Sequence, residues 1–177
     1  MSLQKKEKMN KVIAFFLCLT ALISCDDGDL EIPAFDFEEE VHYCDTENNE
    51  YTLFRMGIAE AIIVTLPTSA IQNKVTIEPK TVSITESNVV YRTFNEEIST
   101  AYFCGNVPPT APQILSNWIG ISGGSNNILI ETIEELDASN NITGYRHFIS
   151  FQNLKVEKGG KHIAFEETEF GEIVTTI

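Results

Sequence analysis

The sequence predicts an all-β protein, and three observations carry that prediction. Short apolar runs rich in β-branched and aromatic residues recur along the chain, and no convincing amphipathic helix appears. Turn signals separate these runs at about the 8–12-residue spacing that is typical of sandwiches and barrels. We therefore expect an antiparallel β-sandwich, immunoglobulin-like or jelly-roll-like, with an up-and-down β-barrel as the alternative.

The first expected strand follows a proline and ends at a turn over 44–50. Apolar side chains alternate with acidic or polar ones at Phe35, Phe37, Val41 and Tyr43. A period of two indicates a strand with one buried face. The later runs that predict strands in the first half are 51–56, 60–66, 75–84, 88–94 and 98–105.

Prolines shape the middle of the predicted fold. Pro79 has no amide hydrogen to donate, so it places the run 75–84 at a sheet edge or splits it. The loop 106–113 is rich in proline, and its length suits a crossing from one sheet to the other.

The second half contains two glycine pairs that predict tight hairpins. Gly123-Gly124 and Gly159-Gly160 each separate two apolar runs, so we expect a meander there. Residues 132–138 are the only segment whose sequence could also suit a helix, but they are short and a strong turn follows them. The expected strands are 116–122, 126–136, 142–151, 153–158, 161–167 and 171–177, and the whole chain predicts nine to eleven strands.

The first residues form a targeting pattern. Positive charge gathers at Lys5, Lys6, Lys8 and Lys11, and an apolar stretch of 12 residues follows at 12–23. A helix needs about 20 apolar residues to cross a bilayer, so this stretch is too short. A basic head before a short apolar core indicates a signal peptide.

The end of that stretch resembles a known processing site. Leu22-Ile23-Ser24-Cys25 is similar to the lipobox of bacterial lipoprotein precursors. The resemblance implies that the chain is cut before Cys25 and that the Cys25 thiol receives a diacylglyceryl group. Two acyl chains hold a protein stably at a membrane without a spanning helix. The alternative is a buried N-terminal helix with an incidental cysteine.

Aspartates follow the lipidation site at once. Asp26, Asp27 and Asp29 resemble the surface-export signal of Bacteroidota lipoproteins. In enterobacterial lipoproteins, an aspartate after the cysteine implies retention in the inner membrane, so the two resemblances conflict. We expect a lipid anchor in the outer membrane, with the domain at the cell surface or, alternatively, on the periplasmic face.

The chain therefore divides into a signal peptide at 1–24, an acidic tether at 25–33 and a single β-sandwich domain at 34–177. The formal net charge is −14, and the first 24 residues contribute +3, so −17 remains after the cut. Such a charge argues against a nucleic-acid partner and favours solubility and cationic partners.

The cysteines predict one disulfide. Cys18 leaves with the signal peptide and Cys25 is the lipidation site, which leaves Cys44 and Cys104. Two remaining thiols in an exported protein indicate a bond between them. The alternatives are two buried free thiols, or a metal pair helped by His42, although no metal-ligand spacing supports a metal site.

The sequence contains no catalytic motif. GxSxG, HExxH, GxGxxG and P-loop patterns are absent, and the three histidines lie far apart. His147 shares a strand face with apolar residues, so we expect it to be packed and hydrogen-bonded. Arg92 and Arg146 are expected to pair with acidic neighbours. No cofactor is expected.

Trp118 is the one candidate for ligand binding. Aromatic platforms on β-sandwiches stack on sugar rings, and Trp118 is the only tryptophan, which makes a glycan site conceivable. The competing interpretation places Trp118 in the core.

A wider resemblance covers roughly residues 44–135. VVYRTFN, YFCGNVPPTAPQIL, the tryptophan and ILIET are similar to small lipoproteins of Bacteroidota, particularly flavobacteria, for which the resemblance implies no activity and no functional residues. We expect a lipid-anchored envelope protein that serves as a surface-exposed binding or structural module without catalytic activity, with a glycan or another envelope protein as its partner. The alternatives are a periplasm-facing assembly or maintenance lipoprotein, and a hydrolase whose site the sequence does not reveal.

Overall fold

The computed structural model describes residues 37, 40–44, 49–105, 109–165 and 169–177. The chain divides into two units, residues 1–30 and residues 31–177, and every described residue belongs to the second. The predicted signal peptide and acidic tether lie outside the described residues.

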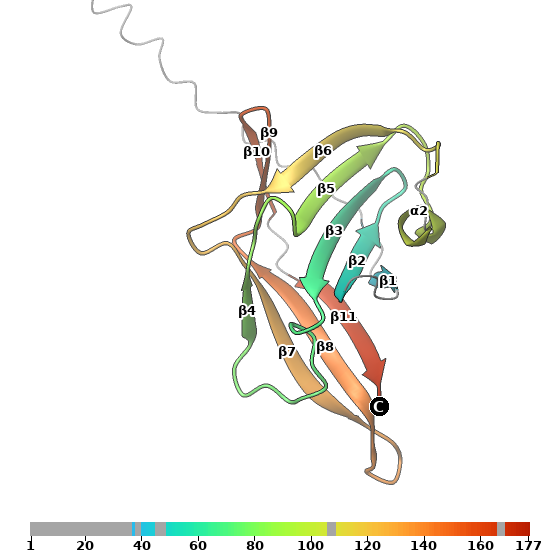
Figure 1. The fold of residues 1–177 in the computed structure, drawn as a ribbon, viewed down its shortest axis with the longest axis vertical. Helices are drawn as coiled ribbons and strands as arrows, with labels where there is room; N and C mark the ends of the chain where they lie inside the picture. The colour runs from blue at the N-terminus through green and yellow to red at the C-terminus, as the bar shows by residue number, and fades with distance from the viewer. Residues whose placement is uncertain (1–36, 38–39, 45–48, 106–108, 166–168) are drawn as a thin grey trace, which may run out of the picture. The chain divides into compact units, whose positions relative to one another are not determined.

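Two antiparallel sheets form the domain, as Figure 1 shows. The larger sheet has seven strands, and their spatial order is β1 (His42–Cys44), β2 (Glu50–Met56), β3 (Glu60–Pro67), β5 (Val89–Phe94), β6 (Ile114–Gly120), β9 (Lys155–Lys158) and β10 (Lys161–Ala164). The smaller sheet has four, in the order β11 (Glu169–Thr176), β8 (Ile142–Gln152), β7 (Asn127–Leu136) and β4 (Lys80–Ser83). The two sheets do not close on each other, so the predicted sandwich is confirmed and the barrel alternative is wrong.

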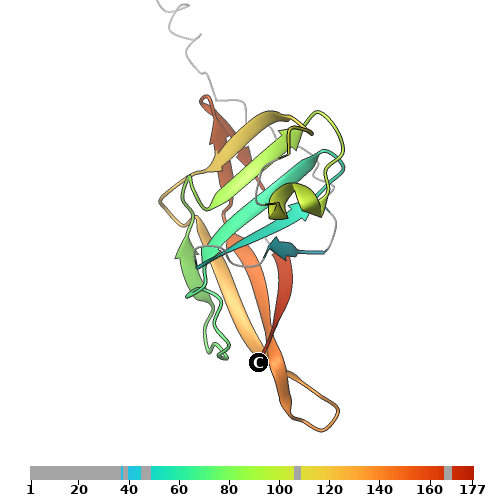
Figure 2. The same cartoon turned by 45° about the vertical axis from the view of Figure 1, so that its right-hand side comes forward.

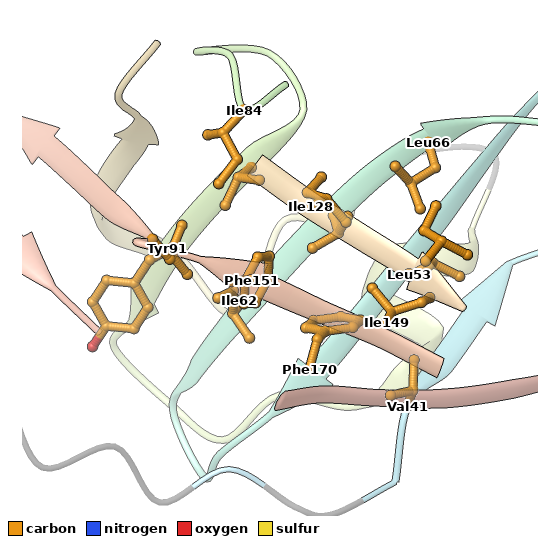
Figure 3. Close-up of a cluster of buried hydrophobic side chains, with 14 of the residues drawn as sticks. Val41, Leu53, Ile62, Leu66, Ile84, Tyr91, Ile128, Ile149, Phe151 and Phe170 are labelled. Carbon is orange, nitrogen blue, oxygen red and sulfur yellow. The ribbon is translucent and has the colours of Figure 1, made fainter. Parts of the chain in front are cut away.

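The core lies between the sheets, because strands such as β7 and β8 turn alternate apolar positions inward. Figure 3 shows side chains from both sheets meeting there. Burial of each large aliphatic or aromatic side chain contributes about 1.5–3 kcal/mol relative to exposure. The buried side chains include Leu53, Ile62, Leu66, Ile84, Ile128, Ile149, Phe151 and Phe170.

The first strand is shorter than predicted. β1 covers only His42–Cys44, and the alternation survives in part, because Val41 is buried. Tyr43 falls on the same phase but is 44% exposed. β1 pairs on one side only, with β2, so its side chains are not fully covered.

The strand predicted at 98–105 is wrong, because this segment holds the short helix α2 (Thr100–Cys104). Neighbouring residues on a strand point to opposite faces, yet both Tyr102 and Phe103 pack on Phe94, with ring centroids 5.0 and 6.3 Å away. A helical turn allows both contacts at once. Figure 2 shows α2 lying across strands of the larger sheet.

The helix covers a second, smaller core on the outer side of the larger sheet. Its buried members are Phe54, Met56, Ala61, Phe94 and Ile98. Strand β2 therefore carries a continuous buried run over its last four residues instead of an alternation, because both of its faces are covered.

The links between strands also differ from prediction. The proline-rich loop does not cross between sheets, because the two strands on either side of it, β5 and β6, pair directly. Gly123 and Gly124, with φ of 92° and 63°, join β6 in one sheet to β7 in the other instead of closing a hairpin. The predicted meander is therefore wrong as a whole, although β7–β8 and β9–β10 are hairpins.

The placement of the proline at 79 is confirmed. β4 begins at the next residue, Lys80, and pairs only with β7, so it is an edge strand of the smaller sheet.

Candidate functional site

The outer face of the smaller sheet carries an unusual mixture of exposed side chains. On β8, Tyr145, His147, Ile149 and Phe151 alternate toward the core, which leaves Arg146 and Phe148 on the outer face. We name this surface the β8 face and define it by six residues, Glu131, Ile133, Arg146, Phe148, Glu172 and Val174.

Strand register sets the pattern of this face. Phe148 lies directly between Glu131 of β7 and Glu172 of β11. Two residues along β8, Arg146 lies between Ile133 and Val174 in the same way. Side chains at paired positions on one face are neighbours, so two carboxylates flank Phe148 and two aliphatic side chains flank Arg146.

The apolar members of the β8 face are open to solvent. Ile133, Phe148 and Val174 are 40%, 36% and 39% exposed. They occupy three adjacent strands, with Ile133 and Val174 diagonal to Phe148, where an aromatic side chain can reach both. Exposed apolar surface rimmed by polar groups is typical of interaction sites.

Arg146 ties the three strands of the β8 face together. Its Nε and Nη2 donate to the two carboxylate oxygens of Glu135 at 2.9 and 3.0 Å, and Nη1 donates to Glu172. These bonds lower the pKa of Glu135 and raise that of Arg146, so both groups stay charged. The predicted ion pairing of Arg146 is confirmed, whereas Arg92 donates to the amide oxygen of Asn117 at 3.0 Å.

A groove continues the β8 face around the side of the sandwich. It has a volume of about 410 Å³ and lies between the edge strands β1 and β11, where Val41 and Tyr43 face Ile173 and Val174. Glu40 and Glu172 add two carboxylates to its lining. We name it the edge groove.

His147 is buried beneath the β8 face, as predicted. It is 0% exposed, and its Nδ1 and Nε2 lie 2.9 and 3.0 Å from the hydroxyls of Thr132 and Thr175. The Thr175 hydroxyl donates to Asn73 Oδ1 at 2.6 Å, so it accepts the Nε2 proton. Burial lowers the pKa of His147, so its imidazole is neutral at pH 7. Its role in the fold is structural.

Two further groups have shifted pKa values for structural reasons. Burial, followed by a 2.6 Å hydrogen bond to Glu60, raises the pKa of the Tyr91 hydroxyl. Hydrogen bonds from Asn141 and Ser139 lower the pKa of Asp137, which closes the turn between β7 and β8.

Trp118 lies in the main core. Its side chain is 8% exposed, its indole N–H donates to Ser116 at 3.1 Å, and the Lys158 ammonium lies 6.0 Å from its ring centroid. The ring therefore offers no open platform for a sugar, which agrees with the competing interpretation of this residue.

Cys44 and Cys104 form the predicted disulfide, with their Cα atoms 5.2 Å apart. The bond joins the last residue of β1 to the last residue of α2. It anchors the helix over the second core, which explains how a five-residue helix keeps its place.

The other predicted site residues, Cys25, Asp26, Asp27 and Asp29, lie outside the described residues. In the described part of the chain, no group of three or more His, Cys, Asp or Glu residues is placed to hold a metal ion. No helix there combines the length and apolar character needed to cross a membrane.

Sequence reasoning did not identify the β8 face. Its signal was present in the run 142–151, where an arginine and a phenylalanine share the alternation phase opposite to the buried one. An aromatic residue on the solvent phase of a strand marks such a surface.

Comparisons with models of known families, with curated proteins and with solved structures found no match for this chain.

Proposed function

We propose that this chain is a lipid-anchored protein of the bacterial cell envelope, exposed at the cell surface, whose β-sandwich serves as a binding module without catalytic activity. The anchor rests on the basic head, the short apolar core and the lipobox resemblance that ends at Cys25. The binding role rests on one observation, the exposed apolar and acidic β8 face.

The charge of the β8 face favours a basic protein partner. The face carries Glu131 and Glu172 with a single cation, Arg146, which also bonds the neighbouring Glu135, so the surface is acidic overall. A cation over the ring of Phe148 would be favoured by the ring quadrupole and by the carboxylate on either side. The partner surface would therefore present Lys or Arg beside apolar side chains.

The edge groove favours an extended segment of that partner. β11 is an edge strand of eight residues without Lys or Pro, whereas the other edges, β1, β4 and β10, have three or four residues each. Arg55 and Asn73 bond the Glu169 and Thr176 carbonyls at the two ends of β11. A bulge lies between Glu169 and Gly171, so an added strand would pair with the middle of β11. A strand added along β11 would place its side chains against the edge groove, which Val174 helps to line.

Photo-crosslinking on intact cells tests this function. A photoreactive phenylalanine analogue at position 148 should give one adduct of defined mass, whereas the same analogue at Leu115, which is 65% exposed on the larger sheet, should not. Glu131→Lys should abolish the adduct because it reverses a charge beside Phe148. Glu97→Lys, at an exposed site far along the chain, is the matched control and should leave it intact.

The result also discriminates between explanations. An adduct that persists in the Glu131→Lys variant, or that forms equally from position 115, would contradict the proposed binding face.

A further inference from the structure

A second hollow lies on the side of the smaller sheet away from the edge groove. The connection between β3 and β4 folds back against β7, where the Thr76 amide donates to the Thr132 carbonyl at 3.1 Å and the Thr132 amide donates to Thr76 Oγ1 at 2.9 Å. These bonds shape a pocket of about 200 Å³. Its polar lining consists of Gln72, Lys74, Thr76, Lys80 and Thr132.

The pocket is positively charged in a strongly acidic protein. Eight Lys and Arg residues follow Cys25 in the sequence, and two of them line this pocket together, with no carboxylate in the described lining. Lys74 and Lys80 take part in no ion pair with another described residue. Glu78, which lies between them in the sequence, is exposed and is not part of the lining.

Lys74 lies on the connection between β3 and β4, and Lys80 is the first residue of β4. The Lys80 ammonium donates to the Ser69 carbonyl, which keeps it close to the start of the connection. Asn73, the neighbour of Lys74, bonds to β11 through the Thr175 hydroxyl at 2.6 Å and the Thr176 carbonyl at 3.4 Å. Hydrogen bonds at Asn73 and Thr76 therefore fasten the connection to β11 and β7 on either side of Lys74, which lowers the entropic cost of binding.

A second set of hydrogen bonds lies behind the pocket. The Thr132 hydroxyl contacts buried His147 at 2.9 Å, and His147 contacts Thr175, so hydrogen bonds link the pocket to the strand that holds Asn73. Thr132 itself is only 2% exposed. Lys74 and Lys80 therefore line the pocket together with buried Thr132, and Thr76 and Gln72 add a hydroxyl and an amide.

We propose that this pocket binds a phosphate group. Lysine binds phosphate as a compact point charge, and two lysines at one pocket match a phosphate group, which carries a charge of about −1.5 to −2 at pH 7, better than a singly charged carboxylate. The volume is below the range of about 300–1,000 Å³ that drug-sized ligands occupy, so it fits one phosphate group with little else. The group belongs either to a free phosphate ester or to the headgroup of a lipid at the membrane that anchors the protein.

The test is a titration of the protein, as purified from cells, with inorganic phosphate, followed through its amide resonances. We expect saturable shifts that centre on residues 72–76, Lys80 and Thr132. Lys74→Gln should weaken binding about tenfold, because one charge-assisted contact is lost. Lys80→Gln should do the same, and Lys155→Gln, which removes an equal charge from the other sheet, should leave affinity unchanged.

Two further ligands identify the source and the chemistry. Glycerol 3-phosphate that binds more tightly than inorganic phosphate supports a lipid headgroup, whereas equal affinity supports a free phosphate group. Acetate that binds as tightly as phosphate overturns the proposal, because the site would then recognise charge alone. Absence of saturable shifts, or equal weakening by Lys155→Gln, overturns it as well. Lys74→Gln keeps the test valid if Lys80→Gln disturbs the loop, because Lys74 makes no side-chain bond to a described residue.

Discussion

At the scale of single residues, His147 links the pH of the medium to the stability of the sandwich. It lies at 0% exposure between two threonine hydroxyls, one on β7 and one on β11. The surrounding core disfavours the imidazolium ion, so burial holds the pKa in the folded protein below its ordinary value of 6.5. Just below pH 6.5, His147 is therefore protonated more in the unfolded chain than in the folded protein.

We predict that neutral His147 makes its full contribution to the free energy of unfolding above about pH 6.5. That contribution declines as the pH falls below this value, by at most about 1.4 kcal/mol per pH unit. His147→Gln, which does not titrate, should be less stable near neutral pH by about 1–3 kcal/mol because the threonine hydroxyls lose partners. Its stability should also fall less steeply between pH 6.5 and 5 than that of the wild type. Urea unfolding over this range measures both effects.

His162 provides the control for that series. It is half-exposed on β10, and its ring lies 3.4 Å from Glu157. His162→Gln should leave the steep decline below pH 6.5 intact. Parallel pH profiles for the wild type and His147→Gln would contradict the prediction.

Gly144 of β8 lies against the backbone of β11. A Cβ atom built there would lie 2.2 Å from the Thr175 carbonyl oxygen of β11, a backbone atom that cannot rotate away. We predict that Gly144→Ala lowers the free energy of unfolding by about 1–3 kcal/mol, as overpacking does. Thermal unfolding measures the loss, and Ser150→Ala on the outer face of β8 should change stability by less than about 0.5 kcal/mol. Equal stability of the two variants would show that β11 shifts freely.

At the scale of secondary-structure elements, α2 depends on contacts outside itself. A helix of five residues is too short to be stable alone, since isolated helices below about 12–15 residues are marginal in water. Phe103 stacks on Phe54 with ring centroids 4.3 Å apart, and the disulfide holds the end of the helix to β1. Packing and the covalent bond together replace the missing helical length.

We predict that replacing both cysteines of this disulfide with serine lowers the free energy of unfolding by about 4 kcal/mol, the chain-entropy value for a loop of 60 residues. The amide resonances of α2 should broaden or shift more than those of β7 and β8. Calorimetry of the oxidised and reduced wild type checks the result independently. A reduced protein that unfolds at the same temperature as the oxidised one would contradict it.

At the scale of the whole molecule, the proposed anchor and the proposed binding module would act together. A lipid at Cys25 would hold the domain at the membrane, where a partner of the β8 face would also be confined. We predict that Cys25→Ala leaves the precursor uncut and without lipid, because the acceptor thiol is gone. Mass spectrometry of the membrane form should otherwise show diacylglycerol on Cys25, and a mature N-terminus elsewhere would contradict the assignment.

The acidic residues after Cys25 make a separate prediction. Replacing Asp26, Asp27 and Asp29 with alanine should leave lipidation intact but keep the protein on the periplasmic side. Protease treatment of intact cells, followed by detection of this protein, separates the two locations. If the variant is cleaved as readily as its parent, the acidic run is only a tether.

The sequence by itself determined most of the strands and, for several of them, which face is buried, although the segment 98–105 forms a helix and β2 is covered on both faces. The alternation in 142–151 places His147 in the core, the hydrophobic runs locate β2, β3 and β5, and Pro79 marks an edge. The count of cysteines was enough to predict the disulfide. These features are local or compositional, so a single chain displays them directly.

Only the tertiary structure decided which strands are neighbours and what the outer faces expose. Gly123-Gly124 permits a tight turn whether the next strand pairs or changes sheet, so turn chemistry could not distinguish a hairpin from a crossing. The helix at Thr100–Cys104 packs on a second apolar surface of the larger sheet, which stabilises it. The β8 face and the lysine pocket bring together residues up to 62 positions apart, through strand register and loop packing. Periodicity specifies a buried face but not the partner that covers it, which is the physical reason these sites appear only in the folded molecule.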